Sequence, residues 1–85
     1  MSYDIFLSQT ADNFLNKIET VTAHRIRTKI ALLKENPELG KPLVGRLKGL
    51  WSLRIGDYRA VYEIEHNKLY VFVIQVGHRK NIYEN

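Results

Sequence analysis

The sequence predicts an α+β domain in which an N-terminal strand and an antiparallel helical hairpin precede a three-stranded antiparallel meander and a short C-terminal tail. Two patterns support this prediction. Apolar residues alternate over 3–7 and again from residue 50 onward, which is the period of a strand. Between these stretches they recur every three or four positions, which is the period of an amphipathic helix. With 85 residues, the chain is expected to form a single domain with one core, residues 1–85.

The two helices are defined by their apolar spacing and by the residues at their ends. The first begins at Ser8 or Thr10, either of which can act as an N-cap. The second ends at Asn36, because the residue before Pro37 avoids the helical region. Their apolar stripes are Ala11, Phe14, Leu15 and Ile18, and Ala23, Ile26, Ile30 and Leu33. Few residues separate the helices, so they are expected to lie antiparallel.

A β-hairpin follows a basic loop that is expected from Gly40 to Gly49. Its strands, Leu50–Ile55 and Tyr58–Glu65, are joined by Gly56-Asp57, a two-residue turn with glycine first. Counting from this turn predicts that Ile55 pairs with Tyr58, Leu53 with Ala60, Trp51 with Tyr62 and, on the opposite face, Arg54 with Arg59.

The third strand of the meander is predicted over Leu69–Val76, an apolar run typical of a central strand. It follows a turn of two or three residues that begins at His66. The turn length decides which of Val73 and Ile74 faces the core, and the sequence does not distinguish these two alternatives. Gly77 is expected to end the strand and to release a short tail that could make one helical turn.

Composition excludes several classes of protein. The chain has 45% hydrophobic and 26% charged residues, which is ordinary globular usage. It has no cysteine, so disulfides, thiolate zinc sites and cysteine nucleophiles are excluded, and the cytoplasm is the expected compartment. We expect no leader peptide and no membrane span, because no apolar run is long enough.

The net charge of +4 is unevenly distributed. Residues 1–40 carry five basic and five acidic residues, whereas residues 41–85 carry eight basic and four acidic residues. This segregation favours a polyanionic partner, nucleic acid first and an acidic protein segment second, although a merely soluble basic surface remains an alternative.

A cluster of basic side chains is the strongest chemical signal. Arg54 opposite Arg59 places like charges together in a sheet, which is destabilising unless an anion lies between them. Alternatively, Glu63 or Asp57 could neutralise one of these arginines while the other lies in solvent. Arg79 and Tyr83 are spaced i, i+4, so a helical tail would present both on one face. Folded beside the hairpin, this tail would complete a phosphate-binding site.

The histidines match no metal-ligand spacing, and we expect no metal and no cofactor. His24 is expected on a helix surface and His66 in a turn, whereas His78 lies in the tail and could contact RNA or accept a proton.

Taken together, the chain resembles the RelE/ParE superfamily of toxins from type II toxin-antitoxin pairs, and within it the RelE branch. The resemblance rests on the Gly56-Asp57-Tyr58-Arg59 turn and on Gly77-His78-Arg79 followed by Tyr83. It implies a small microbial RNase fold and an endoribonuclease that cuts mRNA in the ribosomal A site by attack of the RNA 2′-hydroxyl on the adjacent phosphate. It also implies partners, namely mRNA and 16S rRNA on the ribosome and a cognate RelB-like antitoxin.

The resemblance also implies site residues. The catalytic positions fall on Arg54, Arg59, Arg79 and Tyr83, with Tyr83 as the best candidate base. The predicted RNA-binding positions are Arg46, Lys48, Ser52, His78 and Lys80. Ser52 departs from the best-known RelE pattern, which has a lysine there, and Lys48 or Arg46 could substitute for it.

Two other functions are consistent with the sequence. A ParE-type toxin of the same fold would inhibit DNA gyrase without nuclease activity, but the opposed arginines would then be unexplained. A stand-alone RNA-binding module would need aromatic residues on an open sheet face. Tyr70 and Phe72 could serve, although we expect them to be buried by helices or by the tail.

Overall fold

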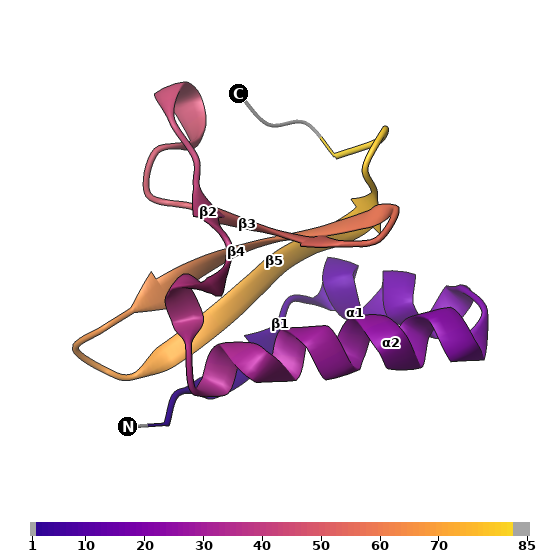
Figure 1. Cartoon of the computed structure of the whole chain (residues 1–85), viewed down its shortest axis with the longest axis horizontal. Coiled ribbons are helices and arrows are strands. Elements are labelled where there is room, and N and C mark those ends of the chain that lie inside the picture. Colours follow the sequence, from indigo (N-terminus) through magenta and orange to yellow (C-terminus); the bar gives the residue numbers. More distant parts are fainter. Residues whose placement is uncertain (1, 83–85) are drawn as a thin grey trace.

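The computed structural model describes residues 2–82 and contains two α-helices packed on one face of a five-stranded sheet (Figure 1). In spatial order the strands are β1 (Asp4–Leu7), β5 (Tyr70–His78), β4 (Tyr58–Glu65), β3 (Trp51–Ile55) and β2 (Lys41–Pro42). β1 runs parallel to β5, and the other neighbours are antiparallel. The predicted α+β class is confirmed.

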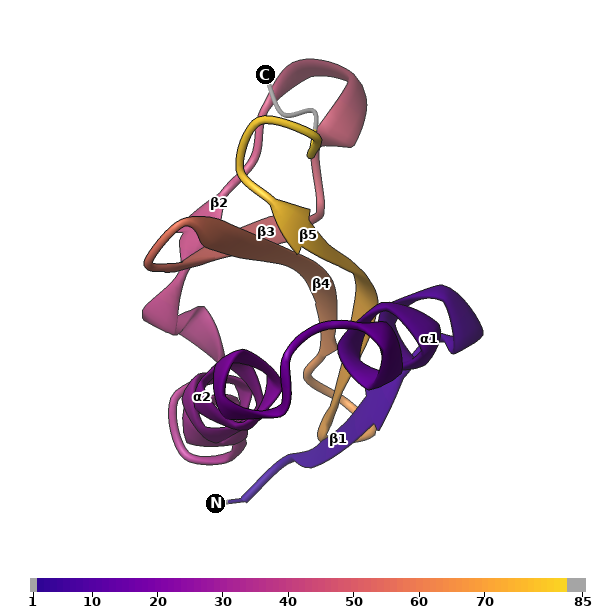
Figure 2. The ribbon, with the colours of Figure 1, turned by 90° about the vertical axis from the view of Figure 1, so that its right-hand side faces the viewer.

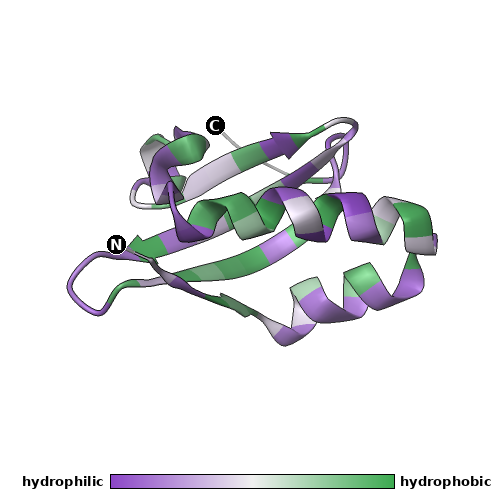
Figure 3. Cartoon of the chain, turned by 60° about the horizontal axis from the view of Figure 1, so that its bottom comes forward, coloured by the Kyte–Doolittle hydropathy of each residue, from purple (hydrophilic) through white to green (hydrophobic). Residues whose placement is uncertain are grey.

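The helical hairpin consists of α1 (Gln9–Lys17) and α2 (Thr20–Ala31), and a 3-10 turn, Leu32–Lys34, continues α2. Further 3-10 turns span Pro37–Leu39 and Gly45–Leu47. Ser8 is the N-cap of α1, because its side-chain oxygen accepts a hydrogen bond from the Ala11 N–H at 3.0 Å. Hydrophobic and hydrophilic residues alternate around both helices (Figure 3). The apolar ones pack against the face of the sheet that the helices cover.

β2 is an element that the sequence prediction missed, since 40–49 was predicted to be a loop. Lys41 and Pro42 pair with Ser52 and Trp51 at the edge of the sheet. Two residues are too few to show an alternating pattern, and a proline is tolerated at a sheet edge. Gly40 allows the close approach, because a Cβ there would collide with the main-chain carbonyl of Ser52.

The hairpin register is confirmed, and every predicted β3–β4 pair is present. The turn before β5 has four residues rather than two or three, because Glu65 pairs with Tyr70. Val73 faces the core. A β-bulge beside it shifts the alternation by one residue, so the next side chain that faces the core is that of Val76. The predicted end of the strand at Gly77 is wrong, because Gly77 still pairs with Arg59 and β5 runs to His78.

Two apolar clusters are present where one core was expected. The main cluster lies between the sheet and the helices. A smaller one, made by Leu43, Val61 and Ile82, lies on the opposite face, where the loop before β3 meets the tail (Figure 2). No helix within residues 2–82 is both long and apolar enough to cross a membrane.

Candidate functional site

The β3–β4 hairpin presents two arginines on the sheet face that points away from the helices. Arg54 and Arg59 are direct Cα partners, as predicted. Their neighbours Leu53, Ile55 and Ala60 belong to the main core, so the alternation of a strand directs the arginines outward. Arg54 is exposed and Arg59 is half-buried. Within the described chain, Arg54 forms no ion pair with Glu63 or Asp57 and lies in solvent, which is compatible with the alternative in which only one arginine of the pair has a carboxylate partner.

The tail folds beside this hairpin, as the sequence suggested. The Arg79 main-chain N–H donates a hydrogen bond of 2.8 Å to the carbonyl of Asp57, the second residue of the hairpin turn. The Asn81 N–H donates to the His78 carbonyl at 2.8 Å and closes a tight turn. Ile82 then packs over Gly77, where an added Cβ would lie 2.8 Å from its Cδ1. These contacts hold residues 79–82 against the hairpin and β5.

A hollow of about 290 Å³ lies where the tail meets the hairpin, and we call it the tail hollow. It is lined by Asp57, Arg59, His78, Arg79 and Lys80. The His78 ring contacts Tyr58 edge-on, with centroids 5.7 Å apart, and its Nδ1 accepts a hydrogen bond of 3.3 Å from the Lys80 N–H. Among the described residues, three basic side chains and one carboxylate line this hollow, and guanidinium groups in such a grouping suit an anion.

A second hollow of about 390 Å³, the edge hollow, lies beside β2 and shares Arg59 with the tail hollow. Ser52 lines it together with Arg54. Lys41 of β2 and Lys29 of α2 line it as well. These lysines supply positive charge around Ser52, a role that the sequence prediction gave to Lys48 or Arg46.

The structure therefore brings together most of the predicted site residues. Arg46 and Lys48 are exposed on the loop that precedes β3 and line neither hollow. Tyr83 lies outside the described residues. Lys29 and Lys41 were missed because a lysine on a helix and a lysine in an apparent loop carry no local signal, and only the fold brings them beside β3.

The remaining candidates have structural explanations. His24 is exposed on α2, and His66 lies in the β4–β5 turn, where its Nδ1 is 2.8 Å from the Tyr3 hydroxyl; both positions are as predicted. Within residues 2–82, no group of three histidines or carboxylates could hold a metal ion.

Tyr70 and Phe72 are half-buried, but not by the helices, so their expected burial is met only in part. Val71 and Val73 point into the core, so the alternation of β5 turns these aromatic rings to the opposite face of the sheet. Their strand partners are glutamates of β4, which would repel phosphate, so this face is a poor platform for RNA.

Comparisons with known proteins agree on one family. Residues 5–83 match the model of the ParE toxin of type II toxin-antitoxin systems. Toxin RelE of Mycobacterium tuberculosis is 36% identical over 83 residues, covering 95% of this chain and 86% of that protein. Toxin RelG of the same organism is 33% identical over 85 residues, covering 98% of each.

Solved structures give the same result. The RelBE2 toxin-antitoxin complex of Mycobacterium tuberculosis contains a chain that superposes with a TM-score of 0.83 at 30% identity, covering 93% of this chain and all (100%) of that one. For the RelBE toxin-antitoxin complex of Escherichia coli the TM-score is 0.75 at 25% identity, with 91% and 96% covered.

Proposed function

This chain belongs to the RelE/ParE superfamily of type II toxin-antitoxin toxins, and from this membership we propose that it is a ribosome-dependent endoribonuclease. It cleaves mRNA in the ribosomal A site in the cytoplasm and thereby inhibits translation. A RelB-like antitoxin neutralises it, as the RelBE complexes of similar toxins suggest. The RelE and RelG names of its relatives support this branch of the superfamily.

One observation carries the proposal. The hydrogen bond from the Arg79 N–H to the Asp57 carbonyl attaches the tail to the hairpin that bears Arg54 opposite Arg59. Arg59 and Arg79 consequently line one hollow, and Arg54 and Arg59 line the next. Such a grouping of guanidinium groups matches the charge and the paired oxygen atoms of an RNA phosphate.

In the proposed reaction the 2′-hydroxyl gives its proton to a base while its oxygen bonds to the adjacent phosphorus. The bond from phosphorus to the 5′-oxygen breaks, and that oxygen takes up a proton from water. The products are a 2′,3′-cyclic phosphate and a 5′-hydroxyl. Negative charge grows on the phosphate oxygens during this step, and fixed cations stabilise it.

Each residue has a distinct proposed role. Arg54 and Arg59 bind the phosphate, and Arg79 stabilises the departing 5′-oxygen, because an arginine holds its proton too tightly to be an efficient acid. Tyr83 is proposed as the base, as the resemblance to the RelE branch implies. His78 and Lys80 contact RNA at the tail hollow. The ribosome positions the substrate.

The experiment is a translation reaction with purified ribosomes and a defined mRNA, with cut sites mapped by primer extension. Wild-type protein should cut within A-site codons. Arg79→Ala should lower the cleavage rate by about 100-fold or more, whereas Lys68→Ala, an exposed turn cation, should cleave normally. Circular dichroism checks that both variants fold. Normal cleavage by a folded Arg79→Ala protein would refute the assignment of the site.

A second candidate function is inhibition of DNA gyrase, which is favoured by the match to the ParE family model. A supercoiling assay run in parallel separates the two functions. Intact mRNA together with inhibited supercoiling would assign the chain to the ParE branch.

A further inference from the structure

Ser52, a predicted RNA-binding residue, is a buried polar side chain in the wall of the edge hollow. It is only 8% exposed, and it lies on the same sheet face as Arg54, because the two are separated by one residue of β3. Within residues 2–82 its hydroxyl forms no hydrogen bond, although most buried polar groups do. The hydroxyl is therefore available to a ligand in the hollow.

Lys41 of β2 is the residue directly opposite Ser52. The two are Cα partners in the antiparallel β2–β3 pair, and directly opposite residues project from the same face of a sheet. Lys41 is exposed and, in the described part of the chain, forms no ion pair. A cation and a neutral hydrogen-bond donor are thus brought together from two neighbouring strands.

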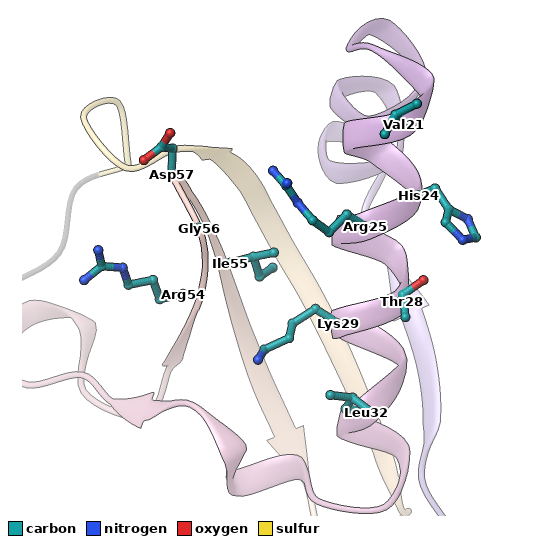
Figure 4. A pocket seen from close by; sticks show the side chains of 10 residues that line it. All are labelled: Val21, His24, Arg25, Thr28, Lys29, Leu32, Arg54, Ile55, Gly56 and Asp57. Atoms are coloured by element: carbon teal, nitrogen blue, oxygen red, sulfur yellow. The ribbon is translucent and has the colours of Figure 1, made fainter.

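A second lysine reaches the same hollow past the end of β2. This strand pairs only with Trp51 and Ser52, so it leaves the edge of β3 uncovered at Arg54. Lys29 of α2 is half-buried and extends toward the β3–β4 hairpin (Figure 4). With Lys29, four basic side chains and no carboxylate of the described residues line the edge hollow. Its lining therefore favours an anion.

The edge hollow and the tail hollow are arranged as two neighbouring anion sites, and Arg59 lines both. Along β3, Ser52 lies two residues from Arg54, which is a distance of about 7 Å. Successive phosphates of an extended RNA strand are separated by a comparable distance. One strand can therefore place one phosphate between Arg54 and Arg59 and the next phosphate beside Ser52 and Lys41.

The proposed roles fix the direction of that strand. Arg79 stabilises the departing 5′-oxygen, which belongs to the nucleotide on the 3′ side of the cut. The Arg79 main chain is bonded to Asp57 in the hairpin turn, whereas Ser52 lies beyond Arg54, farther from this turn. RNA on the 3′ side of the cut consequently runs toward the tail, and RNA on the 5′ side runs toward the edge hollow.

We propose that the edge hollow is a second phosphate subsite, in which Lys41 and Ser52 bind the phosphate that precedes the cleaved one by one nucleotide on the 5′ side. The Ser52 hydroxyl donates to a phosphate oxygen, and Lys29 adds positive charge at the sheet edge. A neutral serine suffices at position 52, because the charge comes from the neighbouring strand. The direction of the strand rests on the proposed function, whereas the presence of two adjacent phosphate sites does not depend on cleavage.

The first test measures binding without cleavage, using the full chain and 2′-O-methyl RNA without terminal phosphates. A dinucleotide then carries one phosphate and a trinucleotide carries two, and NMR titration of the Ser52 and Lys41 main-chain N–H signals gives both affinities. The trinucleotide should bind about tenfold more tightly to the wild-type protein. Lys41→Ala should reduce this gain to less than about threefold, whereas Lys41→Arg and the exposed turn variant Lys68→Ala should keep it.

The second test determines the direction of the strand. A ribosome-bound mRNA receives a neutral methylphosphonate in place of the phosphate one nucleotide to the 5′ side of the cut. This change should slow cleavage by the wild-type protein about tenfold. Lys41→Ala, checked for folding by circular dichroism, should slow cleavage of the normal mRNA by a similar factor. The methylphosphonate should then slow this variant by less than about twofold, because the lysine that it deprives of a charge partner is already absent.

Different failures have different meanings. Equal affinity of the wild-type protein for both oligonucleotides, or a gain that Lys41→Ala keeps, would overturn the second subsite. Loss of the gain in Lys48→Ala alone would assign the phosphate to the loop before β3 instead. Independent effects of Lys41→Ala and the 5′ methylphosphonate on cleavage would overturn the direction. A wild-type protein that prefers the trinucleotide but cleaves no mRNA would refute the proposed function and the direction with it, while supporting the two adjacent phosphate sites.

Discussion

Tyr62 shows how a single side chain determines where the sheet edge lies. It is completely buried in the main core, yet its hydroxyl is bonded twice: it donates to the Pro37 carbonyl at 2.7 Å and accepts from the Gly40 N–H at 3.1 Å. Both partners belong to the segment that leads into β2. Burial raises the pKa of Tyr62 and the Glu38 carboxylate raises it further, while the Gly40 hydrogen bond acts in the opposite direction.

Tyr62→Phe should lower the free energy of unfolding by about 1 to 3 kcal/mol at neutral pH, because it leaves a buried carbonyl and N–H unpaired. Alkaline pH adds a second signature. The pKa of Tyr62 in the folded state exceeds its ordinary value of 10.0, so the unfolded chain loses this proton first and wild-type stability falls as pH rises above 10.0. The variant should lack that part of the decline. Urea unfolding across this range measures it, and parallel curves for both proteins would contradict it.

At the scale of elements, Ser8 joins the first helix to the central strand. Its hydroxyl accepts from Ala11 as the N-cap of α1 and donates to the carbonyl of Ile74 beside the β5 bulge. One oxygen thus satisfies a free helix N–H and a carbonyl that the bulge removes from regular pairing.

Ser8→Ala should therefore lower the free energy of unfolding by about 1 to 2 kcal/mol, toward the upper end of cap losses, because two bonds are removed. Ser8→Thr keeps the hydroxyl and serves as the control, with a smaller loss expected. Urea unfolding at neutral pH compares the three proteins. A loss in Ser8→Ala no greater than in Ser8→Thr would show that the shared hydroxyl adds little.

The position of the tail depends on the absence of a side chain at Gly77. A Cβ at Gly77 would lie 2.8 Å from Ile82 Cδ1, so Gly77→Ala should displace the tail and Arg79 with it. We expect mRNA cleavage to fall about tenfold, while the free energy of unfolding changes by less than about 1 kcal/mol, because a shift of the tail disturbs only the smaller apolar cluster and leaves the main core intact. Adding Ile82→Val removes the blocking atom and should restore part of the activity. Unchanged cleavage in Gly77→Ala would show that cleavage does not depend on the position of the tail.

At the scale of the whole molecule, charge is divided along the open face of the sheet. The end beside the tail carries Arg54 and Arg59, whereas the opposite end of β4 carries Glu63 and Glu65. Two of the eight basic residues of 41–85 thus lie at one end of this face and two glutamates at the other. A polyanion should bind in one orientation.

Binding of a 2′-O-methyl RNA oligonucleotide, which cannot be cleaved, should depend steeply on salt. About four phosphate contacts predict a slope of about −3 in log affinity against log salt concentration. Lys80→Ala should reduce the magnitude of the slope by about 0.7, and Lys17→Ala, an α1 control, should not change it. Fluorescence anisotropy over a range of salt concentrations gives the slope. A slope near zero would exclude a phosphate-binding surface.

The sequence by itself determined the helices, the hairpin and the opposed arginines, because each is encoded in local spacing. The stripes of α1 and α2 follow the helical period, and the register that places Arg54 opposite Arg59 can be counted from a two-residue turn. The tertiary structure alone decided β2, the bulge in β5 and the approach of Lys29 and Lys41 to Ser52. These features depend on contacts between residues far apart in the chain, such as Gly40 against Ser52 and Ser8 against Ile74, which no local period records.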